Sequence, residues 1–159
     1  MRTFAAVAAL SFALAGVAHA QETEKLSLVI SPLVGTDRSV GLSAGLHTDV
    51  GRLSYGVTAI GTGGDTRWAG ALLDGRFSLL SSDFSPYLGL GLGAFSMRTA
   101  ALDLGMRLTA SAEAGLEYRR FFAGVRALLP MSSRSAGPAS HDQSGWADSA
   151  LFLQAGFRL

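Results

Sequence analysis

The chain has 159 residues and no cysteine. This excludes disulfide bonds, thiolate metal sites and an anchor built on a lipid-modified cysteine. Lysine is almost absent as well, because twelve of the 13 basic residues are arginine and only Lys25 is lysine.

The sequence also lacks an apolar run long enough for a membrane-spanning helix. Its longest such run lies in residues 1–20, where the basic Arg2 precedes a stretch of Ala, Val, Leu and Phe that ends in the tripeptide A-H-A. A spanning helix needs ~20 apolar residues. A basic start, a shorter apolar run and an A-x-A site are typical of a secretory signal peptide. We expect a cleaved signal peptide over residues 1–20 and one domain over residues 21–159.

Neither sign of charge predominates in the expected mature chain. Without Arg2, 12 basic residues face 12 acidic ones. This balance argues against nucleic acid or an anionic surface as a general electrostatic partner. The mean hydropathy is nevertheless positive, at +0.32. An exported, apolar chain without a spanning helix points to a closed barrel, which is the other structure that satisfies every backbone group in lipid.

Apolar residues alternate with small or polar ones over most of the chain, and this period of two predicts β-strands. The alternating segments are residues 26–34, 40–48, 53–60, 69–79, 87–95, 106–119, 121–129 and 149–159. Tilted strands of this length cross a bilayer. The sequence therefore predicts an all-β fold, an eight-stranded antiparallel up-and-down transmembrane β-barrel.

The expected connections alternate in length along the chain. Asp49–Arg52, Tyr118–Phe121 and residues 81–85 look like short turns. Longer connections are expected at residues 35–39, 61–67, 97–105 and 130–146. Outer-membrane barrels place short turns in the periplasm and longer loops outside the cell.

Small residues on the polar faces favour a membrane barrel over a soluble one. Gly89, Gly91 and Gly93 would only weaken a strand exposed to water. Inside a narrow barrel they leave room for long side chains that cross the lumen. The aromatic residues also resemble two rim bands, with Trp68 and Trp146 at one rim and Tyr55, Phe84, Phe121 and Phe157 at the other.

The charged residues on the same faces predict a structural ion-pair network in the lumen. A two-residue turn at Arg119–Arg120 puts Glu113 opposite Arg126. The predicted network comprises Asp74, Arg76, Arg107, Glu113, Glu117, Arg126 and Arg158, with Arg119 beside them. His47, on the polar face, is expected to be a hydrogen-bonding lumen residue rather than a ligand.

Four features together resemble the small outer-membrane barrels, the eight-stranded fold of OmpX-like and OmpW-like proteins and of the OmpA membrane domain. They are the signal peptide, "SPYLGLGLGAF" (85–95), "AEAGLEYR" (112–119) and the terminal "LFLQAGFRL". The resemblance implies residence in outer-membrane lipid. It also implies that the barrel-assembly machinery reads the last strand, here through Leu151, Leu153, Phe157 and Leu159. Such strands usually end in an aromatic residue, whereas this one ends in Leu159.

No catalytic motif is convincing. "GLGLGA" (89–94) matches a loose dinucleotide fingerprint, but no helical period follows it. His141 and Asp142 stand among serines in the longest loop, with no sign of the rigid geometry that a triad needs. Lipid A deacylases of the PagL type are similar barrels with an H-x-S motif, and the corresponding histidine position here is Leu129.

We therefore expect a non-catalytic barrel that acts as a structural or surface-interaction protein through its outer loops. No catalytic residue, cofactor, metal site or nucleic-acid partner is predicted, and neither a ligand nor an extracellular partner can be named. Two alternatives remain open. One is a lipid A-modifying enzyme, with Ser132 or Ser133 misaligned. The other is a narrow channel or carrier for small apolar compounds.

Overall fold

The computed structural model describes residues 25–64, 66–99, 103–131 and 149–159. Eight strands account for most of them: β1 (Lys25–Gly35), β2 (Val40–Val50), β3 (Leu53–Gly63), β4 (Thr66–Ser78), β5 (Phe84–Thr99), β6 (Asp103–Tyr118), β7 (Phe121–Pro130) and β8 (Ala150–Arg158). The expected signal peptide and most of the loop at 130–146 lie outside the described residues.

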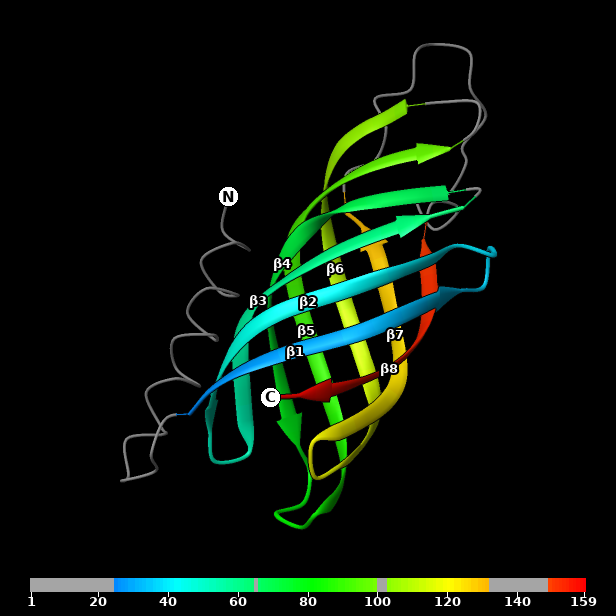
Figure 1. The fold of residues 1–159 in the computed structure, drawn as a ribbon. Helices are drawn as coiled ribbons and strands as arrows, with labels where there is room; N and C mark the ends of the chain where they lie inside the picture. The colour runs from blue at the N-terminus through cyan, green and yellow to red at the C-terminus, as the bar shows by residue number, and fades with distance from the viewer. Residues whose placement is uncertain (1–24, 65, 100–102, 132–148) are drawn as a thin grey trace.

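The eight strands form one closed antiparallel barrel, as the alternation predicted (Figure 1). Each strand pairs with the next in sequence, and β8 returns to pair with β1. At this seam, Leu28 and Leu159 exchange two backbone hydrogen bonds, of 3.0 and 2.9 Å. Closure leaves no strand edge with unpaired amide groups.

The two ends of the barrel differ in their connections. At one end, which we call the short-turn end, residues 51–52, 79–83 and 119–120 join the strands. The other end, which we call the loop end, has the connections at 36–39, 64–65, 100–102 and 131–149. The chain enters β1 and leaves β8 at the short-turn end.

Two of the expected long connections are shorter than predicted, because the strands extend into them. The segment expected to be a loop at 97–105 belongs largely to β5 and β6, and most of the segment at 61–67 belongs to β3 and β4. Gly61 and Gly63 continue the backbone pairing with β2. Glycine interrupts the alternation of side chains but not the backbone hydrogen bonding, so the alternation predicts strands that are too short.

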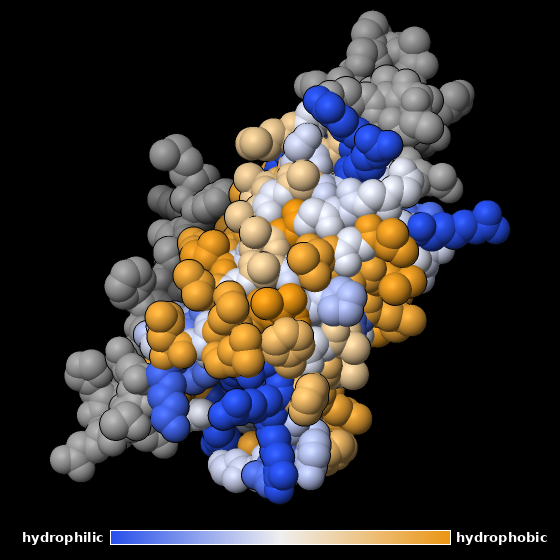
Figure 2. Space-filling view, viewed as in Figure 1, coloured by the Kyte–Doolittle hydropathy of each residue, from blue (hydrophilic) through white to orange (hydrophobic). Residues whose placement is uncertain are grey.

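Large apolar side chains cover the outside of the barrel (Figure 2). They include Leu26, Leu46, Val57, Leu73, Leu88, Leu90, Met106, Leu116, Leu151 and Leu153. Polar and charged side chains are buried inside. The predicted orientation of the strand faces is confirmed, including Leu151, Leu153 and Phe157 outside and Gln154 inside on β8. None of the described residues forms a helix that is long and apolar enough to cross a membrane.

The lumen is packed with side chains in layers. Toward the loop end lies an apolar cluster of Leu33, Ile60, Trp68, Leu72, Phe95, Met97, Leu128, Ala150 and Phe152. Toward the short-turn end lie Val29, Tyr87 and Phe122. Four buried charged residues lie between these two clusters, namely Asp74, Arg76, Glu113 and Arg126, whereas Arg107 lies opposite Phe95 of the loop-end cluster.

The predicted pair of aromatic rim bands is wrong at Trp68. This side chain is 1% exposed and packs edge-on against Phe95 inside the barrel, with ring centroids 6.1 Å apart. Trp68 is in phase with Leu72 and Asp74 on β4, so the period of two itself points it inward. Trp146 lies outside the described residues.

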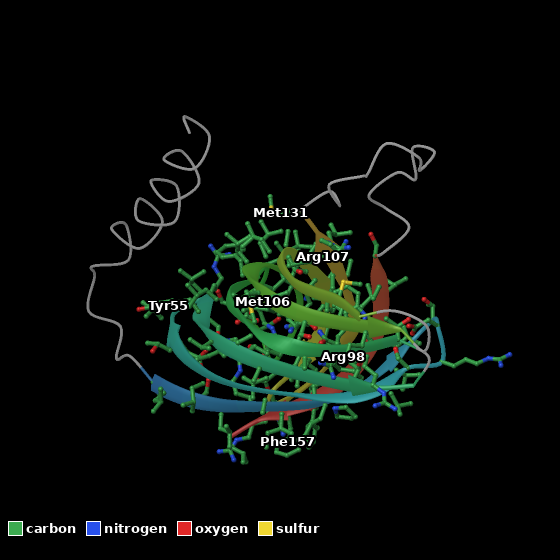
Figure 3. All side chains as sticks on the ribbon, turned by 90° about the horizontal axis from the view of Figure 1, so that it is seen from above. Tyr55, Arg98, Met106, Arg107, Met131 and Phe157 are labelled. Atoms are coloured by element: carbon green, nitrogen blue, oxygen red, sulfur yellow. The ribbon has the colours of Figure 1, made fainter. Side chains whose placement is uncertain are left out.

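The other expected rim band lies on the outer surface near the short-turn end. Tyr55, Phe84, Phe121 and Phe157 are between 37% and 65% exposed. Tyr55 and Phe157 point away from the barrel in Figure 3.

Candidate functional site

The central feature of the lumen is the pair formed by Glu113 of β6 and Arg126 of β7. These residues are direct partners in the strand register, as the two-residue turn at Arg119–Arg120 predicted. Arg126 Nε donates to Glu113 Oε2 over 3.0 Å, and Arg126 Nη2 donates to the same oxygen. Both residues are buried, with Arg126 only 1% exposed.

Two residues of β4 reach across the lumen to this pair. Arg126 Nη2 donates to Asp74 Oδ2 over 3.3 Å, and Arg76 Nη2 lies 2.9 Å from Glu113 Oε1. Two arginines and two carboxylates thus neutralise one another in a site closed to water. Burial of such charges is tolerated only when they are paired and hydrogen-bonded.

His47 of β2 extends this arrangement on the far side of Asp74. Its Nε2 lies 2.9 Å from Thr58 Oγ1 and 3.4 Å from Asp74 Oδ1. Its Nδ1 lies 3.3 Å from Ser54 Oγ. Thr58 Oγ1 in turn donates to Asp74 over 3.0 Å. His47 is thus a buried hydrogen-bonding residue of the lumen, and one polar network runs from β2 to β7.

Glycines on β5 provide the space for these side chains. A Cβ atom added at Gly91 would lie 2.9 Å from the Asp74 Cβ. One added at Gly89 would lie 3.3 Å from both the Arg76 Cγ and the Glu113 Cβ. The glycine run on β5 therefore belongs to the ion-pair network rather than to a phosphate-binding loop.

Aromatic rings cover the network on its short-turn side. The Arg76 guanidinium lies over the Phe122 ring at 4.3 Å and over the Tyr87 ring at 5.3 Å. The two rings meet edge-to-face, with centroids 6.3 Å apart. Gln154 Nε2 donates to the Tyr87 hydroxyl over 3.3 Å.

A second group of charges lies at the mouth of the short-turn end. Arg158 Nη1 lies 3.1 Å from Asp49 Oδ1 and 3.6 Å from Glu117 Oε1. These residues lie at an open hollow of about 410 Å³ on the short-turn end. Its lining includes Arg52, Ser78, Ser85, Glu117, Arg119 and Arg158.

The seven residues predicted for one lumen network occupy three places. Asp74, Arg76, Glu113 and Arg126 meet in the middle of the barrel. Glu117 and Arg158 form their own pair at the mouth. Arg107 is buried on β6 nearer the loop end, opposite Phe95 of the apolar cluster there.

Arg119 is not in the lumen, so its predicted place in the network is wrong. It occupies the β6–β7 turn with a φ of 56°. Its side chain is 65% exposed, and its Nε donates to Asp83 over 3.1 Å. A residue in a two-residue hairpin loop leaves the alternation of the strand, which is why the count along β6 misplaced it.

Sequence reasoning missed the link from His47 to Asp74 and the role of Asp49 as a partner of Arg158. The signal for His47 was present, because it shares the inward phase of β2. His47 and Asp74 are both cross-strand partners of Gly56, so the registers of the β2–β3 and β3–β4 hairpins bring them together.

The geometry of this lumen network is more typical of a structural role than of a catalytic one. Asp74 and Glu113 each accept from Arg126, so neither is a free general base. Within the described part of the chain, no group of three or more His, Asp or Glu side chains is placed to hold a metal ion. Leu129, at the expected position of a deacylase histidine, is only partly buried on β7, and Ser132 and Ser133 lie outside the described residues.

No protein-family model matches the chain, and no curated protein sequence matches it. Solved structures are similar in fold. Neisserial surface protein A superposes with a TM-score of 0.59 at 14% identity, over 87% of this chain and 99% of that one. The outer membrane enzyme PagL gives 0.56 at 15%, over 84% and 98%. The N-terminal β-barrel domain of Pseudomonas aeruginosa OprF gives 0.56 at 13%, over 86% and 100%. The chain thus has the fold of the small eight-stranded outer-membrane barrels.

Proposed function

We propose that this protein is a non-catalytic barrel of the bacterial outer membrane, with a structural or surface-interaction role carried by the connections at its loop end. The segment at 130–146 is the longest of these connections. The role fits a barrel that is built as a rigid support, with the groups that contact other molecules in its loops.

The observation that carries the proposal is the distribution of polarity. A soluble barrel buries its large apolar side chains, whereas this one exposes leucines on nearly every strand and buries Arg76, Glu113 and Arg126. An apolar outside and a polar inside are what a lipid environment requires. The structural neighbours are proteins of bacterial outer membranes or their domains, which supports the same location.

The filled lumen supports a role other than transport. Eight strands enclose only enough space for side chains. Here the paired charges and the two apolar clusters occupy that space.

Membrane residence can be tested on the expressed protein. In cells, the protein should fractionate with the outer membrane and run faster on a gel when it is not boiled, because a folded barrel stays compact in detergent. Recovery as a soluble protein without detergent, with no heat-dependent shift, would refute the proposal.

The same cells test the enzymatic alternative, which is relevant because the enzyme PagL has a similar fold. We expect lipid A mass spectra with and without expression to show the same acylation. Loss of an acyl chain that depends on expression would replace the non-catalytic proposal with a deacylase.

A further inference from the structure

The outer faces of β4 and β5 carry the same sequence of side-chain types in register. From the middle of the barrel toward the loop end, β4 presents Leu73, Ala71, Ala69 and Arg67, and β5 presents Leu92, Ala94, Ser96 and Arg98. Each residue of one series is the direct partner of its counterpart in the other. Two parallel tracks thus run from leucine through small residues to arginine.

The small residues form the floor of a shallow trough that is wider than these two strands. On β3, Ala59 and Gly61 pair with Ala71 and Ala69 and continue the floor. A Cβ atom added at Gly61 would meet nothing within 4 Å. Three strands at ~4.8 Å spacing make this floor about 14 Å wide.

Larger side chains form the borders of the trough. Leu42 of β2 lies opposite Gly61 and is 53% exposed. On the other side, Met106 of β6 lies opposite Ser96 and is 77% exposed. Figure 2 shows a paler zone of small residues between the orange apolar side chains and the blue charged ones toward the upper end of the molecule.

Two arginines stand side by side at the loop end of the trough. Arg67 and Arg98 are direct cross-strand partners, and both are exposed. Like charges placed directly opposite each other destabilise a sheet unless an anion lies between them. The Arg67 side chain has no hydrogen bond, ion pair or ring contact with the described residues. Arg98 already takes part in a further interaction within the chain, so the Arg67 side chain is the more available of the two.

The spacing suits the boundary of a bilayer. Leu73 lies six positions after Arg67, which at ~3.3 Å per residue is about 20 Å along the strand. A strand tilt of ~40° reduces this to about 15 Å along the membrane normal, which is half of the ~30 Å hydrocarbon core. Arginines at that height meet lipid headgroups when Leu73 lies near the midplane.

We propose that this trough binds one molecule of a phosphorylated, multiply acylated lipid of the lipid A type in the outer leaflet. A phosphate group lies between Arg67 and Arg98, and several acyl chains lie on the floor of Ala69, Ala71 and Ala94. The width of the floor favours a lipid with more than two chains. The inference rests on the proposed location in the outer membrane.

The test is lipid binding by the full chain folded in detergent, measured by native mass spectrometry. The probes are bisphosphorylated lipid A, dephosphorylated lipid A, phosphatidylglycerol and inorganic phosphate. We expect one tightly bound lipid A and weaker binding of the other three. The Arg67→Gln/Arg98→Gln variant should bind lipid A about twenty-five-fold more weakly, because each arginine near an anionic headgroup contributes about fivefold. Arg120→Gln, at an exposed arginine of the opposite rim, is the matched control and should bind as the wild type does.

A second pair of variants tests the floor. Ala71→Leu/Ala94→Leu fills the trough with apolar side chains that a lipid-facing position tolerates, and it should weaken lipid A binding. Ala123 and Ala155 are also cross-strand partners on the outside, on β7 and β8. Ala123→Leu/Ala155→Leu adds the same atoms elsewhere and should leave binding unchanged.

Three results would overturn the proposal. They are equal lipid A binding by the wild type and the Arg67→Gln/Arg98→Gln variant, equal binding of phosphatidylglycerol, or full competition by inorganic phosphate. Every variant is first checked for the heat-dependent gel shift. A protein that shows the shift but binds no lipid A refutes this inference alone, whereas loss of the shift in the wild type refutes the proposed function itself.

Discussion

Arg126 is the residue that holds both buried carboxylates of the lumen. It donates to Glu113 and to Asp74 from a position that water does not reach. Its removal leaves two buried negative charges with less compensation. Breaking a buried pair in this way costs about 3–5 kcal/mol. We expect Arg126→Ala to lower the free energy of unfolding by about that amount in urea titrations of the refolded barrel, whereas Arg120→Ala should change it little.

The double variant separates the pair from its surroundings. Glu113→Ala combined with Arg126→Ala removes both partners, so its cost should be smaller than the sum of the two single changes. Additive costs would show that Glu113 and Arg126 do not stabilise each other.

Gly115 and Gly124 leave space for the Tyr87 side chain inside the barrel. They are cross-strand partners on β6 and β7, and the Tyr87 hydroxyl lies 2.7 and 2.8 Å from the Cβ position of each. An added Cβ would also lie 2.3 or 2.4 Å from a neighbouring backbone oxygen. We expect Gly115→Ala or Gly124→Ala to destabilise the barrel by about 1–3 kcal/mol, because backbone oxygens cannot move aside as a flexible side chain can.

Gly75 supplies the control for this prediction. It faces outward on β4, and its nearest atom to an added Cβ is 3.7 Å away. Gly75→Ala should leave the unfolding free energy nearly unchanged. Equal destabilisation at Gly75 and Gly115 would mean that the effect is a general one of glycine in strands.

Asp37 makes the turn between β1 and β2 sensitive to acid. Partial burial opposes ionisation of its carboxyl group, but donation from the Ser39 hydroxyl and the Ser39 backbone amide outweighs it and lowers the pKa below the usual 3.8. A carboxyl with a lowered folded pKa stabilises the protein above its unfolded pKa, and this contribution disappears as the pH falls through the folded value.

The stability difference between wild type and Asp37→Asn should therefore be present at neutral pH and shrink below about pH 3.8. Urea titrations at a series of pH values measure it. Ser39→Ala removes the side-chain donor and should reduce the same difference at neutral pH. A difference that stays constant down to acid pH would contradict the role of the ionised carboxylate.

At this scale the sequence predicted neighbours on adjacent strands better than partners across the lumen. Glu113 and Arg126 follow from one turn and a count of residues. The reach of Arg126 to Asp74 does not, because it depends on the stagger of strands that are far apart in sequence. Trp68 was misplaced for another reason, because its position near the loop end is typical of a rim residue, whereas its phase on β4 points it into the lumen.

Among the elements, β8 closes the barrel by pairing with β1 and also presents apolar side chains on the outer surface. Its inner face carries Phe152 and Gln154 into the lumen, and its outer face presents Leu151, Leu153 and Phe157. The alternation predicted both faces of this strand. It could not predict the pairing of β8 with β1, in which Val29 lies opposite Arg158, because no short turn links the two strands.

The outer face of β8 is also the expected signal for the barrel-assembly machinery. Phe157→Ala should lower the amount of folded barrel in the outer membrane of cells, because it removes the aromatic residue nearest the end of the strand. Refolding of the purified variant in detergent should change little. Gel shifts of unboiled membrane samples measure the first quantity, and refolding yields measure the second.

Phe121 provides a matched control, since it is the cross-strand partner of Phe157 and is more exposed. Phe121→Ala should assemble in cells as well as the wild type does. Equal losses for the two variants would indicate a shared role of the rim aromatics in lipid, and not a signal on the last strand.

For the whole molecule, the layers of side chains that fill the lumen predict a barrel that does not conduct ions. The apolar cluster at the loop end and the Tyr87–Phe122 pair lie on either side of the ion pairs between Asp74, Arg76, Glu113 and Arg126. We expect purified protein in planar bilayers to give no stepwise conductance. Steady single-channel openings from the wild type would contradict this and favour the narrow channel.

The fold class was predictable because the period of two predicts β-strands, and the eight alternating segments predict the number of strands in the barrel. The lengths of the connections were less predictable. Strands such as β5 run past the point where side-chain contrast fades, since backbone pairing with β6 continues to Arg98 and Asp103. Hydropathy detects side chains, whereas the ladder depends on the backbone.

The seam between β1 and β8 makes the barrel a ring in which every strand has two neighbours. Leu28 and Leu159 are joined by the same kind of backbone bonds as partners within a hairpin. The chain enters and leaves at the same rim, so a short linker between Lys25 and Leu159 would complete the circle. A new opening at the Gly51–Arg52 turn would keep the strand order around the ring. In such a circular permutant β8 would be an internal strand, and the spatial neighbours of each residue would be kept while its position along the chain changed.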